Sequence, residues 1–152
     1  MTTRIEAACP QTLPEAYNIH MQVTFAPWQY STFADAITAP YTTRVAIYNG
    51  AVAGYAQILM VVDEATLMDI AVDPKLQGQG IGRLLLNDVI SQSVEAGMSA
   101  IWLEVRKSNL AAIHLYEQHH FVIQEIRKHY YPAADGREDA LIMSLTLPNN
   151  TI

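Results

Sequence analysis

The sequence predicts one mixed α/β domain over residues 1–152, with a twisted central sheet of about seven strands and helices on both faces. Two patterns predict this class. In the middle of the chain, apolar runs typical of strands alternate with helical patterns, which indicates parallel strands joined by crossover helices. Towards both ends, strand-like runs follow one another through tight turns, which indicates antiparallel pairing. The length of 152 residues suits a single hydrophobic core.

The N-terminal part predicts a strand followed by two helices. Thr12 can cap a helix that runs to about Phe25, with Glu15 at the reciprocal capping position. A second, short helix covers Tyr30 to Ile37, and Pro40 ends this region.

Three strands should follow as an antiparallel meander. The runs "TTRVAIY" and "AVAGYAQILMVV" flank Asn49-Gly50, a dipeptide typical of a type I′ hairpin turn. The run "ATLMDIAV" is the third strand, and Asp73-Pro74 stops it.

The rest of the chain predicts a helix, a strand, a second helix and two closing strands. The first helix covers about Gly80 to Glu95, with an apolar stripe at four-residue spacing and Gly97 at its end. The run "AIWLEV" is a short buried strand, and Ser108 or Asn109 caps the helix in "AAIHLYEQHH". The runs "FVIQEIRKHYY" and "ALIMSLTL" pair around the Asp135-Gly136 turn.

Composition narrows the possible functions. The net charge of −6 argues against non-specific binding to nucleic acid or to an anionic membrane, and suits a cationic partner. One cysteine excludes an internal disulfide, and neither a signal-peptide core nor a run long enough to span a bilayer is present. We therefore expect a cytoplasmic protein without a membrane segment.

A glycine-rich loop is the most informative local feature. Gly78, Gly80 and Gly82 lie within five positions between an apolar strand and a helix. Such a loop can cradle an anion, because its N–H groups and the helix dipole point at the ligand and no Cβ obstructs the approach. Arg83 could add a charge-assisted contact to phosphate. A tight strand-to-helix connection with incidental glycines is the alternative.

The spacing of this loop excludes two common phosphate sites and resembles a third. Neither the dinucleotide pattern G-x-G-x-x-G nor the P-loop fits. The Q-x-x-G-x-G pattern "QGQGIG" after "IAVDP" resembles the acetyl-CoA loop of the GCN5-related N-acetyltransferases. The stretches "DEATLMDIAVDP", "SNLAAIHLYE" and "YYPAADGREDA" are similar to the RimI-type ribosomal-protein alanine N-acetyltransferases within that superfamily.

The resemblance implies acetyl-CoA as co-substrate. The glycine loop would bind the CoA pyrophosphate, and the strand before it would bond the pantetheine arm where it splays from the parallel strand "AIWLEV". Gly78 stands where the family usually has Arg or Lys, so one side-chain contact to phosphate is absent. The implied acetyl-CoA residues are Ile70, Ala71, Val72, Gly78, Gln79, Gly80, Ile81, Gly82, Arg83 and Asn109.

Two side chains are candidates for the chemistry. Glu104 is the only charge in "AIWLEV", and burial among its neighbours would raise the pKa of this carboxyl. From the residues alone, an ion pair of Glu104 with Arg106 is as plausible as a role in the chemistry. The resemblance implies that Glu104 is a general base. Judged by its residue type alone, Tyr116 is expected to be an ordinary buried tyrosine of the core. The resemblance instead implies that Tyr116 is a general acid. Tyr130 and Tyr131 either flank the acceptor channel or pack on the sheet.

The resemblance further implies direct attack of an amine on acetyl-CoA, with the N-terminal alanine of small-subunit ribosomal protein eighteen as acceptor. The expected partner is therefore the N-terminal segment of a ribosomal protein, with no direct contact to nucleic acid. No metal site is expected, because the five histidines lack metal-ligand spacing, and most of them are expected to be surface or partly packed residues. Transfer to another amine, or a non-catalytic acetyl-CoA sensor, remains open.

Overall fold

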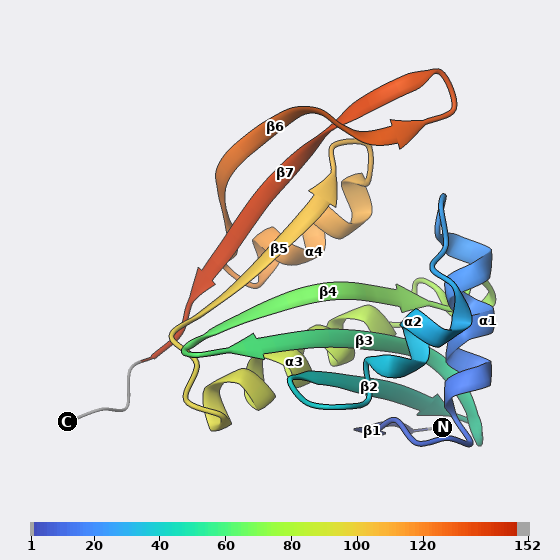
Figure 1. The fold of residues 1–152 in the computed structure, drawn as a ribbon. Coiled ribbons are helices and arrows are strands. Elements are labelled where there is room, and N and C mark those ends of the chain that lie inside the picture. Colours follow the sequence, from blue (N-terminus) through green and yellow to red (C-terminus); the bar gives the residue numbers. More distant parts are fainter. Residues whose placement is uncertain (1, 149–152) are drawn as a thin grey trace.

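The chain forms a seven-stranded sheet with the strand order β1-β2-β3-β4-β5-β7-β6, in a computed structural model that describes residues 2–148 (Figure 1). Strands β4 and β5 pair in parallel, and the other neighbouring strands are antiparallel. The predicted mixed sheet is confirmed. The strands are β1 (Thr3–Ala7), β2 (Tyr41–Tyr48), β3 (Ala51–Val61), β4 (Glu64–Val72), β5 (Ala100–Arg106), β6 (Val122–Ala133) and β7 (Gly136–Thr146).

Helices cover both faces of the sheet, as the sequence predicts. The helices are α1 (Leu13–Val23), α2 (Tyr30–Asp35), α3 (Ile81–Glu95) and α4 (Leu110–Gln118), with a 3-10 turn η1 (Pro74–Leu76) before α3. Helices α1 and α2 bury Leu13 and Phe33 against Tyr55 of β3. Helix α3 buries Leu85 and Val89 on the opposite face of the same strands. Within residues 2–148 no helix is long and apolar enough to cross a membrane.

Most of the predicted turns and caps are present. The Asn49-Gly50 turn has positive φ at both residues, as a type I′ turn requires. At the end of α3, the N–H of Gly97 donates to Val94 and the N–H of Met98 donates to Ser93, which is a Schellman motif. Asn109 caps α4 by accepting a hydrogen bond from the N–H of Ala112 at 3.2 Å.

The predicted capping box at α1 is wrong. Thr12 already has near-helical backbone angles, so its hydroxyl turns back to Cys9 and makes no cap hydrogen bond. Three of the helices are also shorter than predicted. Helix α1 ends at Val23 because Thr24 is extended, α2 ends at Asp35, and α4 ends at Gln118.

Strands β4 and β5 are paired over only part of their length. Their register runs from Glu64 opposite Ala100 to Leu67 opposite Leu103. Beyond Leu67, β4 stays paired with β3 and β5 stays paired with β7, so the two strands diverge (Figure 1). The predicted splay is therefore present, and it leaves one edge of β4 without a strand partner over residues 68–72.

Gly54 of β3 permits the close packing beside this divergence. A Cβ at Gly54 would lie 2.6 Å from the carbonyl oxygen of Ala71 and 3.0 Å from Leu85 Cδ1. Both atoms belong to well-packed elements, and a backbone oxygen of β4 cannot move aside without shifting the strand.

We predict that Gly54→Ala lowers the free energy of unfolding by about 2 kcal/mol, because the added methyl overpacks the β3–β4–α3 contact. Denaturant titration measures the change. Gly82→Ala is the matched control, since its Cβ would meet Leu115 at an ordinary 3.5 Å, and we expect it to keep wild-type stability or to exceed it. Equal stability of the wild type and Gly54→Ala would contradict the packing argument.

Candidate functional site

A cleft of about 890 Å³ lies where β4 and β5 diverge. Its walls come from the end of α1, the second half of β4, the loop before α3, the end of β5 and one side of α4. Gln79 and Tyr130 are the two predicted residues that do not line it. The structure brings the other predicted residues together there: Ile70, Ala71, Val72, Gly78, Gly80, Ile81, Gly82, Arg83, Glu104, Asn109, Tyr116 and Tyr131.

The glycine loop presents unpaired N–H groups to this cleft. Gly80 is the residue before α3 and has φ +83°, a conformation that side chains rarely adopt. The N–H groups of Ile81, Gly82 and Arg83 form the first turn of α3, where no intrahelical acceptor exists. No heavy atom lies within 4 Å of a Cβ built at Gly80. The loop therefore has the donors and the open space that an anionic group needs.

Two side chains around the loop already have partners. Gln77 donates from Nε2 to the carbonyl oxygen of Val72 at 3.4 Å, which ties the loop to the end of β4. Arg83 donates from Nη2 to Gln118 Oε1 at 2.7 Å. Arg83 is exposed, and its partner is a neutral amide, so its guanidinium charge is not neutralised by that contact.

The open edge of β4 supplies backbone groups to the cleft. Ile70, Ala71 and Val72 bond β3 on one side, whereas β5 is paired with β4 only as far as Leu67. Backbone N–H and C=O groups that face the gap are free for a ligand that binds like an added strand.

Glu104 lies on β5 and differs from its prediction in two ways. Its side chain is 38% exposed, because Leu103 and Val105 take the buried face of β5 and Glu104 points to the other face. The expected burial is therefore wrong. The alternative of a pair with Arg106 is not formed, because Arg106 binds Glu138 at 3.0 Å and Glu104 lies 3.4 Å from Arg127 of β6.

Tyr116 is buried on α4, and its ring packs against Phe121. Burial, and then the negative charge of Asp69, raise the pKa of this phenol above its ordinary value. The hydroxyl is protonated at neutral pH, as that of an ordinary tyrosine is. Tyr116 makes no side-chain hydrogen bond within residues 2–148, so its proton is free for a group in the cleft.

The two tyrosines of β6 have different positions. Tyr131 lines the cleft and stacks under the guanidinium of Arg106, with 4.5 Å between the guanidinium carbon and the ring centroid. Burial and the charge of Glu104 raise the pKa of Tyr131 to about 12. Tyr130 packs edge-on against Tyr131 and is 40% exposed. Phe25 stacks on the same guanidinium at 5.4 Å and is a cleft residue that sequence reasoning missed.

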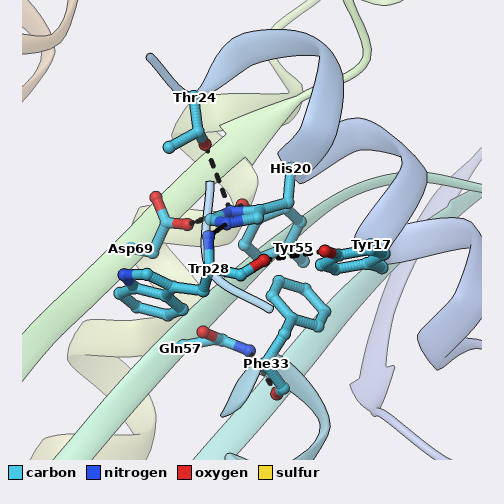
Figure 2. Close-up of polar contacts among 8 residues, drawn as sticks. All are labelled: Tyr17, His20, Thr24, Trp28, Phe33, Tyr55, Gln57 and Asp69. Carbon is cyan, nitrogen blue, oxygen red and sulfur yellow. Dashed lines mark hydrogen bonds and ion pairs between the residues drawn. The ribbon is translucent and has the colours of Figure 1, made fainter. Parts of the chain in front are cut away.

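Sequence reasoning also missed a polar network beside the cleft, which Figure 2 shows. His20 is 1% exposed, so it is not one of the surface or partly packed histidines that the sequence mostly predicts. Its ring bonds Tyr55, Asp69 and Trp28. A signal exists in the sequence, because His20 lies four residues after Ala16 on the apolar face of α1, and Asp69 is the only charge in "ATLMDIAV".

Within residues 2–148 no group of three or more His, Cys, Asp or Glu side chains could hold a metal ion.

Known proteins share both the sequence and the fold. The Acetyltransferase (GNAT) family model matches residues 5–121. The [ribosomal protein bS18]-alanine N-acetyltransferase of Escherichia coli K12 is 47% identical over 135 residues, which cover 89% of this chain and 91% of that protein. The crystal structure of the ribosomal-protein-S18-alanine N-acetyltransferase from Escherichia coli superposes with a TM-score of 0.91, at 42% identity and 99% coverage of both chains.

A more distant structure shares the fold alone. Arabidopsis thaliana NAA60 in complex with acetyl-CoA superposes with a TM-score of 0.86 at 15% identity, over 95% of this chain and 98% of that one. The family model and the 47% identity cover most of the chain and agree with each other. The chain therefore belongs to the GNAT family of acetyltransferases.

Proposed function

We propose that this protein transfers an acetyl group from acetyl-CoA to the N-terminal alanine of small-subunit ribosomal protein eighteen, in the cytoplasm. The observation that carries the proposal is the cleft at the β4–β5 divergence, which joins an anion cradle to a carboxylate and a protonated phenol. The 47% identity to an enzyme named for this reaction supports the choice of acceptor.

The residues of the cleft fit acetyl-CoA. The first turn of α3, with Gly78, Gly80 and Gly82, would hold the pyrophosphate through N–H groups, and Arg83 would add a positive charge. Ile70 to Val72 would bond the pantetheine arm through the open edge of β4. Asn109 lines the same cleft while it caps α4, so the cap and the contact to CoA are compatible roles.

The reaction needs a proton acceptor for the amine and a proton donor for the leaving thiolate. Glu104 is an exposed carboxylate at the cleft and serves as the base, directly or through one water. Tyr116 carries its proton at neutral pH, as a phenol with the ordinary pKa of about 10 also does, and serves as the acid. The amine attacks the thioester directly, so no acyl-enzyme forms. A backbone N–H near Ile70 to Val72 supplies the oxyanion donor.

An α-amine suits this site better than a lysine amine. The reference pKa of an α-amino group is about 7.7–8.0 and that of lysine about 10.4, so a far larger fraction of the α-amine is neutral near pH 7. A carboxylate base removes the proton of the α-amine more easily for the same reason. The net charge of −6 also favours approach of a cationic peptide.

The acceptor is tested with a peptide that carries a free N-terminal alanine and internal lysines. We predict acetylation at the α-amine, and loss of transfer when that terminus is blocked, with mass spectrometry locating the acetyl group. Acetylation of the blocked peptide on lysine at a comparable rate would replace the proposal by transfer to another amine. If the protein binds acetyl-CoA but transfers the acetyl group to no amine, the alternative of a non-catalytic acetyl-CoA sensor would replace the proposal.

Glu104→Gln should lower kcat by about 100-fold at neutral pH, because the amine loses its proton acceptor. The loss should shrink as the pH rises through the pKa of the amine, since the neutral amine then needs no base. Steady-state kinetics from pH 7 to pH 9.5 measure this. The matched control is Glu125→Gln, which removes the other carboxylate beside Arg127 and should keep wild-type kcat. An equal kcat in both variants would mean that Glu104 is not the base and only forms an ion pair with Arg127.

Gly80→Val should weaken acetyl-CoA binding by at least tenfold, because its side chain would project into the space before the first turn of α3. The matched control is Gly97→Val at the other end of α3, where φ is +81° and the backbone strain is the same. Calorimetry should show wild-type affinity in the control, while both variants lose stability to a similar degree. An unchanged affinity in Gly80→Val would place the pyrophosphate elsewhere.

A further inference from the structure

Asp69 is a cleft residue that no step of the reaction above uses. It lies on β4 within the segment that has no β5 partner, and its side chain is 23% exposed. Tyr55 donates its hydroxyl hydrogen to Asp69 Oδ2 at 2.6 Å, and His20 Nδ1 lies 3.0 Å from the same oxygen. Figure 2 shows the second carboxylate oxygen turned away from His20. No hydrogen bond to Asp69 Oδ1 is formed within residues 2–148.

The protonation state of His20 follows from its partners. The backbone N–H of Trp28 donates to His20 Nε2 at 2.9 Å, and a backbone N–H can act only as a donor. Nε2 is therefore unprotonated, and the single ring hydrogen lies on Nδ1, where it faces Asp69, Tyr55 and Thr24. His20 is a neutral donor to Asp69, so the pair within 3.0 Å is a hydrogen bond and not a salt bridge.

Tyr55 is likewise a neutral donor. Burial, and then the charge of Asp69, raise the pKa of its phenol. Asp69 thus has two uncharged donors on one oxygen, and within residues 2–148 no Lys or Arg lies within ion-pairing distance of it. Glu104, by contrast, has Arg127 at 3.4 Å. A partly buried carboxylate without a cation is costly unless a ligand supplies the positive charge.

We propose that Asp69 binds the positively charged N-terminal ammonium of the acceptor through Oδ1, while Tyr55 and His20 position its carboxylate. This inference rests on the proposed function, because it names the contact by which the same cleft recognises a free α-amine. An ammonium has three N–H donors, so one can bond Asp69 while another is donated to Glu104. Asp69, Glu104 and Tyr116 line the same cleft, so an amine bound to Asp69 would lie in the space that the acid–base groups share.

The test compares two peptides that differ only in the amine. One carries a free N-terminal alanine, and the other carries a propionyl group in its place. Their affinities for the protein–CoA complex are measured by calorimetry, so that no transfer occurs. We expect the wild type to bind the alanine peptide at least tenfold more tightly than the propionyl peptide. Equal affinities in the wild type would overturn the inference.

Asp69→Asn should remove that preference. The amide oxygen can still accept from Tyr55 and His20, but the amide NH₂ then faces the cleft and opposes an ammonium. In turnover, KM for the alanine peptide should rise at least tenfold, with acetyl-CoA affinity unchanged. The matched control is Glu64→Gln, which removes a carboxylate from the same strand outside the cleft and should behave as the wild type.

Tyr55→Phe separates positioning from binding. It keeps the Asp69 charge and the buried ring but removes the hydroxyl donor. The preference for the alanine peptide over the propionyl peptide should therefore lie between that of the wild type and that of Asp69→Asn. Thermal unfolding checks that the variant is folded. If the wild type acetylates the alanine peptide but Asp69→Asn and Glu64→Gln have the same KM, the role of Asp69 is overturned and the proposed function stands. If the wild type does not acetylate the peptide, the proposed function itself fails.

Discussion

The divergence of β4 and β5 is the constraint on which the rest of the structure depends. A parallel pair that stayed closed would satisfy the backbone of both strands and leave no cleft. Here the pairing of β4 with β5 ends at Leu67 and Leu103, while β4 stays paired with β3 and β5 stays paired with β7. The open edge of β4, the first turn of α3 and the inner side of α4 are accessible to a ligand only as a result.

The two faces of the opened sheet have different chemistry. The face covered by α3 and α4 is apolar and holds the larger core, which includes Leu85, Leu103 and Tyr116. The face covered by α1 and α2 carries the carboxylates of Asp69 and Glu104, together with His20 and Arg106. A substrate that lies between β4 and β5 therefore contacts packed apolar side chains on one side and charged side chains on the other. This asymmetry suits the joining of a thioester to an amine.

Sequence reasoning succeeded where a local pattern determines the structure. The Asn49-Gly50 turn, the glycine loop and the Asn109 cap follow from backbone requirements that few residue types meet. It failed where the partner comes from a distant strand. Arg106 shares a strand face with Glu104, yet its partner is Glu138 of β7, which no spacing within β5 reveals. The burial of His20 was readable from the periodicity of α1, but the position of Asp69 opposite it required the register of β3 and β4.

The amide of Trp28 has a consequence that reaches beyond its one hydrogen bond. It sets the tautomer of His20 from the main chain, so the indole of Trp28 plays no part in that choice. Any residue with an N–H at position 28 can perform this task, and proline is the one amino acid that cannot. The tautomer of His20 in the cleft is therefore determined by the backbone at position 28 and not by a side chain. A comparison of side chains among relatives would not reveal this hydrogen bond. The bond would remain after most substitutions at position 28.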